Sequence, residues 1–122
     1  MQESPELEAF AETFREANQA TGVEAMLAIY ALGGTSKNTK NLLKNAIFYE
    51  LGLPIKSISF EPLSGLPEES IEYTHQDIDY VATLEPSMRM RVRYATEDRF
   101  ESLYCIAQNN AGEWRIVSTR PK

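Results

Sequence analysis

The sequence predicts an α+β domain in which helices come first and antiparallel strands follow. Up to Pro54 the apolar residues recur every three or four positions, which is typical of amphipathic helices. After Pro54 apolar and polar residues alternate, which is typical of strands. The chain has 122 residues and neither a linker nor a repeat, so we expect a single domain covering residues 1–122.

The first helix is expected to begin at Pro5. Ser4 suits the N-cap position, and proline suits the first helical position because its missing N–H would have no partner there. An apolar stripe then follows at the spacing of one helical face, formed by Leu7, Phe10, Ala11, Phe14 and Ala17.

A second helix is predicted over residues 21–32. Thr21 and Glu24 form a capping box at its start, and Gly33 suits the left-handed residue that ends it. The stretch between them is apolar on nearly every side, and a helix of that kind is expected to be buried.

The third predicted helix is capped by Thr35 or Ser36 and continues to about Leu51, where Gly52 and Pro54 stop it. The residues predicted to face inward are Leu42, Leu43, Ala46, Ile47 and Leu51.

Strands are predicted near 55–62, 76–84, 88–95, 99–108 and 113–119, with a turn-rich loop over 61–70. In strand 88–95 three arginines alternate with apolar residues, so burial should fix its register. The residues predicted to face the helices are Met88, Met90, Val92 and Tyr94.

Strand 88–95 is predicted to pair with the strands on both sides of it in the sequence. On one side the predicted pairs are Leu84–Met88, Ala82–Met90 and Tyr80–Val92; on the other they are Tyr94–Phe100, Val92–Ser102 and Met90–Tyr104. Both registers place a carboxylate, Asp79 or Glu101, opposite Arg93. The last hairpin is ambiguous by one residue, so the faces of Trp114 and Ile116 stay open.

The element order, together with "VEAMLAIY" and "GEWRIV", resembles the nuclear transport factor 2-like superfamily, which includes the SnoaL-like proteins. The resemblance extends over essentially the whole chain. It implies three N-terminal helices packed in the concave face of a strongly curved antiparallel sheet, a cone-shaped α+β roll. Much of the family has a short strand after the second helix, whereas "GGTSKNTK" is too polar and short for a full one.

The predicted pocket between helices and sheet is apolar and lined by tyrosines, with no carboxylate. We call its residues the tyrosine cup: Tyr30, Tyr80, Met90, Tyr94, Ser102 and Tyr104. Such a lining suits a small apolar or aromatic ligand, and no cofactor is expected. Ordinary core packing with hydrogen-bonded phenols explains the same residues equally well.

An enzyme is the alternative interpretation. Several enzymes of the family use an Asp or His base in the pocket, and here His75 or Asp77 would be that base for an isomerase, cyclase or dehydratase. The alternation of His75, Asp77 and Asp79 also suits a divalent metal. A solvated strand start explains these residues better, so no metal site is predicted.

The outer face of the sheet predicts contact with another protein. It combines apolar residues with arginine, and related folds often dimerise through the sheet, so a homodimer or a protein-interaction module is expected. The residues of this predicted dimer face are Val81, Arg91, Leu103 and Cys105. Cys105 is the single cysteine, so no internal disulfide can form.

Charge and hydropathy exclude two classes of partner. A net charge of −6 disfavours nucleic acid, which is bound by clustered Lys and Arg. No apolar run reaches the length of a membrane span. As written, the N-terminus is typical of a cytoplasmic protein; if a signal peptide preceded residue 2, the same residues would begin a secreted or periplasmic chain.

Overall fold

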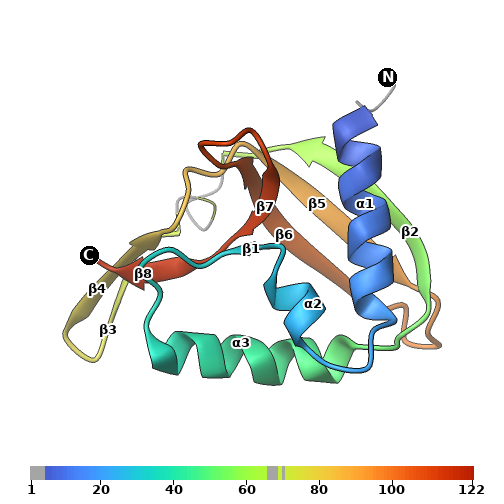
Figure 1. Ribbon diagram of the computed structural model, residues 1–122, viewed down its shortest axis with the longest axis horizontal. Coiled ribbons are helices and arrows are strands. Elements are labelled where there is room, and N and C mark those ends of the chain that lie inside the picture. The colour runs from blue at the N-terminus through green and yellow to red at the C-terminus, as the bar shows by residue number, and fades with distance from the viewer. Residues whose placement is uncertain (1–4, 66–68, 70) are drawn as a thin grey trace.

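The fold is taken from a computed structural model, which describes residues 5–65, 69 and 71–122. Within these residues the chain forms three helices and eight strands, so the α+β class is confirmed (Figure 1). The helices are α1 (Pro5–Asn18), α2 (Glu24–Leu27) and α3 (Lys37–Glu50). The strands are β1 (Tyr30–Ala31), β2 (Ile55–Pro62), β3 (Tyr73–His75), β4 (Ile78–Ala82), β5 (Met88–Tyr94), β6 (Glu101–Gln108), β7 (Trp114–Val117) and β8 (Thr119–Pro121).

The first helix forms as predicted from Pro5 onward, while the proposed cap at Ser4 lies outside the described residues. Its buried residues follow the predicted stripe: Leu7, Phe10, Phe14 and Ala17, together with Asn18. Asn18 ties the end of α1 to the loop between α3 and β2, because its side-chain amide donates to the carbonyl of Leu53 at 2.9 Å.

The second helix is shorter than predicted. Only Glu24–Leu27 is helical, and the N-cap residue is Val23, whose side chain has no polar atom with which to cap. The predicted capping box at Thr21 therefore does not start the helix. A short apolar run suits a strand as well as a buried helix, and here its second half becomes the strand β1.

The third helix begins as predicted but packs differently. The hydroxyl of Ser36 caps it by accepting a hydrogen bond from the N–H of Thr39 at 3.2 Å. Among the described residues of α3, however, Ile47 alone is buried. Leu42 is 69% exposed and Ala46 is also exposed, so the prediction that both face inward is wrong.

The larger sheet has the strand order β1-β7-β6-β5-β2. Its neighbouring strands are antiparallel except for β1 and β7, which pair in parallel, so the prediction of a purely antiparallel sheet is wrong at this edge. The pairing of Ile106 with Ile116 in β6 and β7 also fixes the face that the sequence left open. Ile116 is buried, and Trp114 packs against the same core.

Strand β5 pairs with one neighbour that was predicted, β6, and with one that was not, β2. Its register with β6 is confirmed, with Met90 opposite Tyr104 and Val92 opposite Ser102. On the other side β5 pairs with β2, and the predicted pairs Leu84–Met88, Ala82–Met90 and Tyr80–Val92 are wrong. β2 carries the same apolar alternation and also offers Glu61 opposite Arg89, which adds an ion pair.

Strand β4 belongs instead to a second sheet of the order β3-β4-β8. Tyr80 pairs there with Tyr73 on one side and with Pro121 on the other. Asp79, predicted opposite Arg93, accepts a hydrogen bond from the hydroxyl of Thr74 at 2.6 Å. In Figure 1 this sheet projects to the left of the larger one, near the C-terminus.

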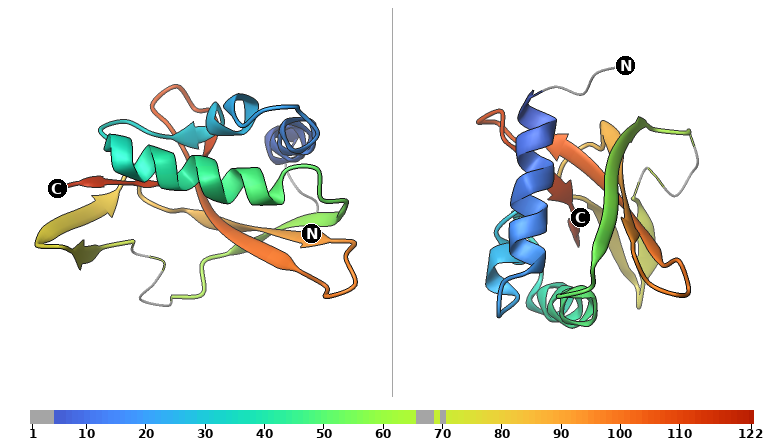
Figure 2. Two further views of the ribbon diagram at one scale, coloured as in Figure 1. Left: turned by 90° about the horizontal axis from the view of Figure 1, so that it is seen from below. Right: turned by 90° about the vertical axis from the view of Figure 1, so that its right-hand side faces the viewer.

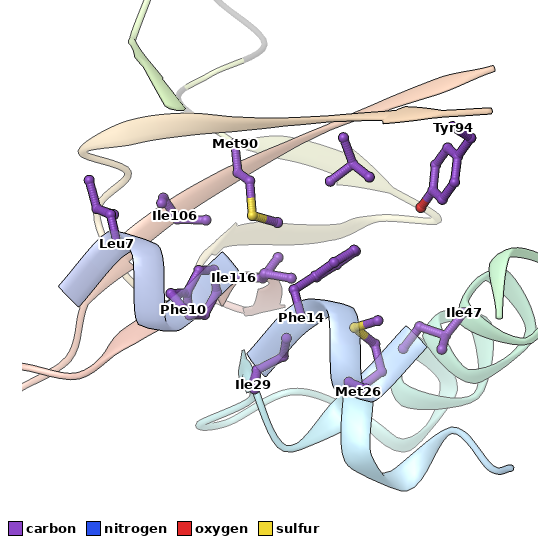
Figure 3. Close-up of a cluster of buried hydrophobic side chains, with 12 residues drawn as sticks. Leu7, Phe10, Phe14, Met26, Ile29, Ile47, Met90, Tyr94, Ile106 and Ile116 are labelled. Carbon is purple, nitrogen blue, oxygen red and sulfur yellow. The ribbon is translucent and has the colours of Figure 1, made fainter. Parts of the chain in front are cut away.

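The helices and the larger sheet share one core. In the right-hand view of Figure 2, α1 lies along one side of the sheet and α3, seen end-on, lies across the lower end of both layers. The residues at the centre of the core come from all three helices and from the sheet: Phe10 and Phe14 of α1, Met26 of α2, Ile47 of α3, and Met90, Val92, Tyr94, Ile106 and Ile116 of the sheet. Figure 3 shows these side chains, all but Val92 with labels. The prediction that the apolar side of β5 faces the helices is thus confirmed.

Candidate functional site

Most of the tyrosine cup does come together on the helix-facing side of the larger sheet. Met90 and Tyr94 are buried, at 0% and 3% exposure, and Ser102 and Tyr104 follow on the neighbouring strand. Tyr30 packs against the same core from β1. The centre of the cup, however, is Glu50, which the sequence pattern did not predict there.

Glu50, the last residue of α3, points its carboxylate into the cup. It accepts hydrogen bonds from the hydroxyl groups of Tyr104 at 2.7 Å, Ser102 at 3.3 Å and Tyr94 at 3.5 Å. Figure 3 shows Tyr94 with its hydroxyl directed toward α3. We call Glu50, Tyr94, Ser102 and Tyr104 the Glu50 cluster.

A signal for Glu50 was present in the sequence. Leu43, Ile47 and Glu50 stand at positions i, i+4 and i+7, which share one face of a helix. Because Ile47 is the buried residue of α3, a carboxylate on its face is carried toward the core. A charged residue at the end of an apolar stripe is usually solvated, which is why the predicted cup contained no carboxylate.

The tyrosines of the site stay protonated at neutral pH. Burial, followed by the negative charge of Glu50, raises the pKa of Tyr94 to about 12. Burial also raises the pKa of Tyr30 and of Tyr104 well above the ordinary value for tyrosine. These phenols are therefore hydrogen-bond donors, and they are poorly suited to act as bases or nucleophiles.

The space beside the cluster is small. A cavity of about 10 Å³ lies there, close to the minimum needed to hold one water molecule. It is lined by Phe14, Asn18, Met26, Ile47, Glu50, Tyr94 and Tyr104. The ring of Phe14 packs against Tyr104 with 5.6 Å between the ring centres. In this conformation the core and the cluster close the site.

Tyr80 does not belong to the cup. It lies on β4 in the second sheet and stacks on Tyr73, with 5.0 Å between ring centres. Both rings line a separate, shallow hollow of about 220 Å³ together with Asp79. The misplacement follows directly from the wrong pairing of strand 76–84 with β5.

His75 and Asp77 lie at the exposed tip of the hairpin between β3 and β4. His75 pairs with Ile78, and the two residues between them, Gln76 and Asp77, have positive φ angles of 51° and 65°. This is the geometry of a two-residue hairpin turn. The turn interrupts the strand, so His75, Asp77 and Asp79 do not share one face as their alternation had predicted. Neither residue joins the Glu50 cluster, and no group suited to a metal ion occurs among the described residues.

The predicted dimer face is only partly contiguous. Arg91 lies opposite Leu103 and Arg89 lies opposite Cys105 on the outer side of the larger sheet. Val81, by contrast, pairs with Arg120 in the second sheet. Burial, with the charge of Glu69, raises the pKa of the Cys105 thiol, which makes a reactive thiolate there unfavourable.

Ion pairs neutralise the arginines of this outer face. Glu61 contacts both Arg89 and Arg91, Glu69 contacts Arg89, and Glu101 contacts Arg91 and Arg93. The hydrogen bond from Arg91 is the main reason that the pKa of Glu61 is lowered.

Comparisons with protein-family models, with curated proteins and with solved structures find no match to this chain. In the described part of the chain, no helix has the length and apolar character needed to cross a membrane.

Proposed function

We propose that this chain is a non-catalytic small-ligand-binding domain with the cone-shaped α+β roll of the nuclear transport factor 2-like superfamily. The ligand binds between the helices and the larger sheet, against the Glu50 cluster. It has an apolar or aromatic body and one hydrogen-bond donor, because the carboxylate of Glu50 is an acceptor.

The observation that carries this proposal is the convergence of three hydroxyl groups on one half-buried carboxylate at the edge of the apolar core. Holding a charge there costs free energy even when it is hydrogen-bonded, and well-packed apolar residues are often as stable or more stable. Folding alone therefore gives little reason for this cluster. Ligand sites commonly combine an apolar lining with a few polar groups that orient the ligand.

Entry of a ligand requires α3 to move, because the cavity holds no more than about one water molecule. The packing of α3 favours such a motion. Ile47 is its one buried residue within the described chain, and Glu50 lies on the same helix. A displacement of α3 would therefore enlarge the site and reposition the carboxylate together.

The enzyme alternative receives no support from this geometry. His75 and Asp77, its expected bases, are exposed at a hairpin tip in the other sheet. The raised pKa of Tyr94 and Tyr104 keeps both hydroxyls protonated, so these groups can bind but do not readily exchange a proton near neutral pH.

The test is an amide-resonance titration with phenol and benzamide, which carry a donor, and with toluene, which does not. Phenol and benzamide should shift resonances of α3, β5 and β6, and toluene should have a weaker effect. Glu50→Gln keeps the shape of the side chain but removes its charge, and it should abolish the preference for the donor probes. Glu16→Gln, at an exposed position of α1, is the matched control and should bind as the unmodified chain does.

Two results would contradict the proposal. One is the absence of any shift in these elements with all three probes. The other is equal binding by the unmodified chain and by Glu50→Gln, since the carboxylate would then have no part in recognition.

A second candidate function is self-association through the outer face of the larger sheet. Leu103 is 47% exposed there, and the charge of Arg91 beside it is already compensated by Glu61 and Glu101, which lowers the cost of removing water. Sedimentation velocity should show a homodimer that Leu103→Asp dissociates. Ile78→Asp, at a similarly exposed position in the second sheet, should not. A monomer in the unmodified chain would exclude this function.

A further inference from the structure

A second hollow, which shares Tyr94 with the Glu50 cluster, lies where the hairpin between β5 and β6 meets the start of β2. Figure 1 shows this hairpin at the lower right. Its volume is about 530 Å³, within the range of about 300–1,000 Å³ that small-molecule sites occupy. It is lined by Lys56, Arg93, Tyr94, Ala95, Thr96, Arg99 and Glu101. We call it the basic hollow.

The basic hollow carries positive charge that the surrounding residues do not balance. Three cationic side chains line it, in a chain whose net charge is −6. Among the described residues of its lining Glu101 is the one carboxylate, and Arg91 and Arg93 already share it. Within the described part of the chain, Lys56 and Arg99 make no ion pair. By contrast, Arg89 and Arg91, on the same sheet face, each pair with two carboxylates: both contact Glu61, Arg89 also contacts Glu69, and Arg91 also contacts Glu101.

Two backbone irregularities bring the unpaired cations to this place. Ile55 pairs with Tyr94 and Ser57 with Arg93, so Lys56 between them is the extra residue of a β-bulge. Bulges redirect side chains and are frequent beside functional sites. Arg99 has a φ of 54°, a left-handed conformation that is uncommon for a residue with a long side chain. Such strained residues cluster at ligand clamps.

The rest of the lining suits an apolar body. The ring of Tyr94 stacks on Phe100 with 5.4 Å between ring centres, which gives this end of the hairpin a firm base. Ala95 is anchored through its N–H to the carbonyl of Pro54 at 2.8 Å. The two acidic residues of the loop, Glu97 and Asp98, do not line the hollow, and Asp98 is engaged by the hydroxyl of Thr96.

We propose that the basic hollow binds a small organic oxyanion, either a carboxylate or a phosphate monoester, that carries an apolar or aromatic body. Lys56, Arg93 and Arg99 hold the oxygens, since a guanidinium presents paired N–H donors that match a carboxylate or phosphate. The body lies against Ala95 and Thr96, beside the buried ring of Tyr94. Because the cations are exposed, binding is of modest strength and weakens with salt.

Titration with four probes tests this proposal: benzoate, phenyl phosphate, inorganic phosphate and the neutral benzyl alcohol. At an ionic strength of about 0.01 M, benzoate and phenyl phosphate should shift amide resonances of residues 54–57 and 93–101. Raising the ionic strength to about 0.15 M should weaken the binding of both probes severalfold. Benzyl alcohol, whose hydroxyl also fits the Glu50 cluster, should leave the resonances of residues 54–57 and 95–100 in place. Binding of inorganic phosphate alone would overturn the proposal of an organic ligand.

Matched variants locate the site. Lys56→Ser and Arg99→Ser should each weaken benzoate binding about three- to fivefold, the loss expected for one exposed charge pair. Lys40→Ser, an exposed lysine on α3, should have no effect. Thermal unfolding of each variant checks that it is folded. If Arg99→Ser and Lys40→Ser bind benzoate equally well, or if no probe shifts these residues, the proposal is wrong.

Discussion

Helices α1 and α3 have the same length, 14 residues, but they contact the rest of the domain at different places. Helix α1 is held along its middle, where Phe10 and Phe14 lie in the core. Helix α3 contributes Ile47 to the core and is otherwise held at its ends, where the hydroxyl of Ser36 caps the start and Glu50 binds Tyr104. Apolar side chains on a helix therefore do not by themselves show which face is buried.

The apolar residues on the outside of α3 make the contrast clear. Leu42, Phe48 and Tyr49 are 69%, 68% and 81% exposed. Segments with few buried apolar contacts open locally at lower free energy than the rest of a domain. We therefore expect α3 to be the more mobile helix, which is the property that the proposed ligand site requires.

The largest expected effect is the loss of the Phe14 ring. Phe14→Ala removes a side chain that is 1% exposed, and it should lower the free energy of unfolding by about 3–5 kcal/mol. Phe48→Ala makes the same change on α3, where the ring is 68% exposed, and should change that free energy by no more than about 0.5 kcal/mol. Urea denaturation measures both. Equal losses in the two variants would show that α3 is buried as deeply as α1.

The next effect concerns the one core residue of α3. Ile47→Ala should cost about 2–4 kcal/mol, because it empties a site in which the side chain is 5% exposed. In the unmodified chain, amide protons of α3 should exchange with solvent faster than those of α1, and in the variant the difference should grow. The comparison fails if the amides of both helices exchange together, at the rate of global unfolding.

The contrast between the helices also explains what the sequence could predict. The stripe of α1 was found because its apolar residues occupy one face and polar residues the other. On α3 apolar residues occupy several faces, so periodicity could not choose between Ile47 and Leu42. The choice depends on where the sheet lies, which is a long-range property that no local pattern contains.

Strand pairing shows the same limit. The register of β5 with β6 was predicted because the two are joined by a short hairpin and a slip by one residue would expose Met90 and Val92. The other neighbour of β5 was mistaken, since β2 and β4 both offer alternating apolar residues and only distance along the chain favoured β4. That single error moved Tyr80 and Val81 into the wrong sheet.

A smaller effect concerns the contact between α3 and the sheet, and it appears at alkaline pH. The pKa of Tyr94 is raised from 10.0 to about 12 by burial and by Glu50, so the folded state favours the protonated phenol. Its contribution to stability is complete below pH 10 and is lost as the pH rises through about 12, by an amount of the order of 2 kcal/mol. Tyr94→Phe should therefore flatten the alkaline decline measured by urea denaturation at a series of pH values.

Glu50→Gln provides the companion variant for this pH dependence. It removes the second cause of the shift and should flatten the decline less than Tyr94→Phe does, because burial is the larger cause. An unchanged decline in Tyr94→Phe would show that other groups control alkaline unfolding.

The smallest expected effect tests the outer side of α3. Tyr49→Ser replaces a side chain that is 81% exposed, so the free energy of unfolding should change by no more than about 0.5 kcal/mol. Because exposed aromatic residues promote association, the variant should also be the more soluble chain. A loss above about 1 kcal/mol that grows with protein concentration would mean that another molecule covers Tyr49 in solution. Helix α3 would then be covered on both sides, by the core and by the other molecule. The difference in burial between α1 and α3 would hold only for the isolated chain.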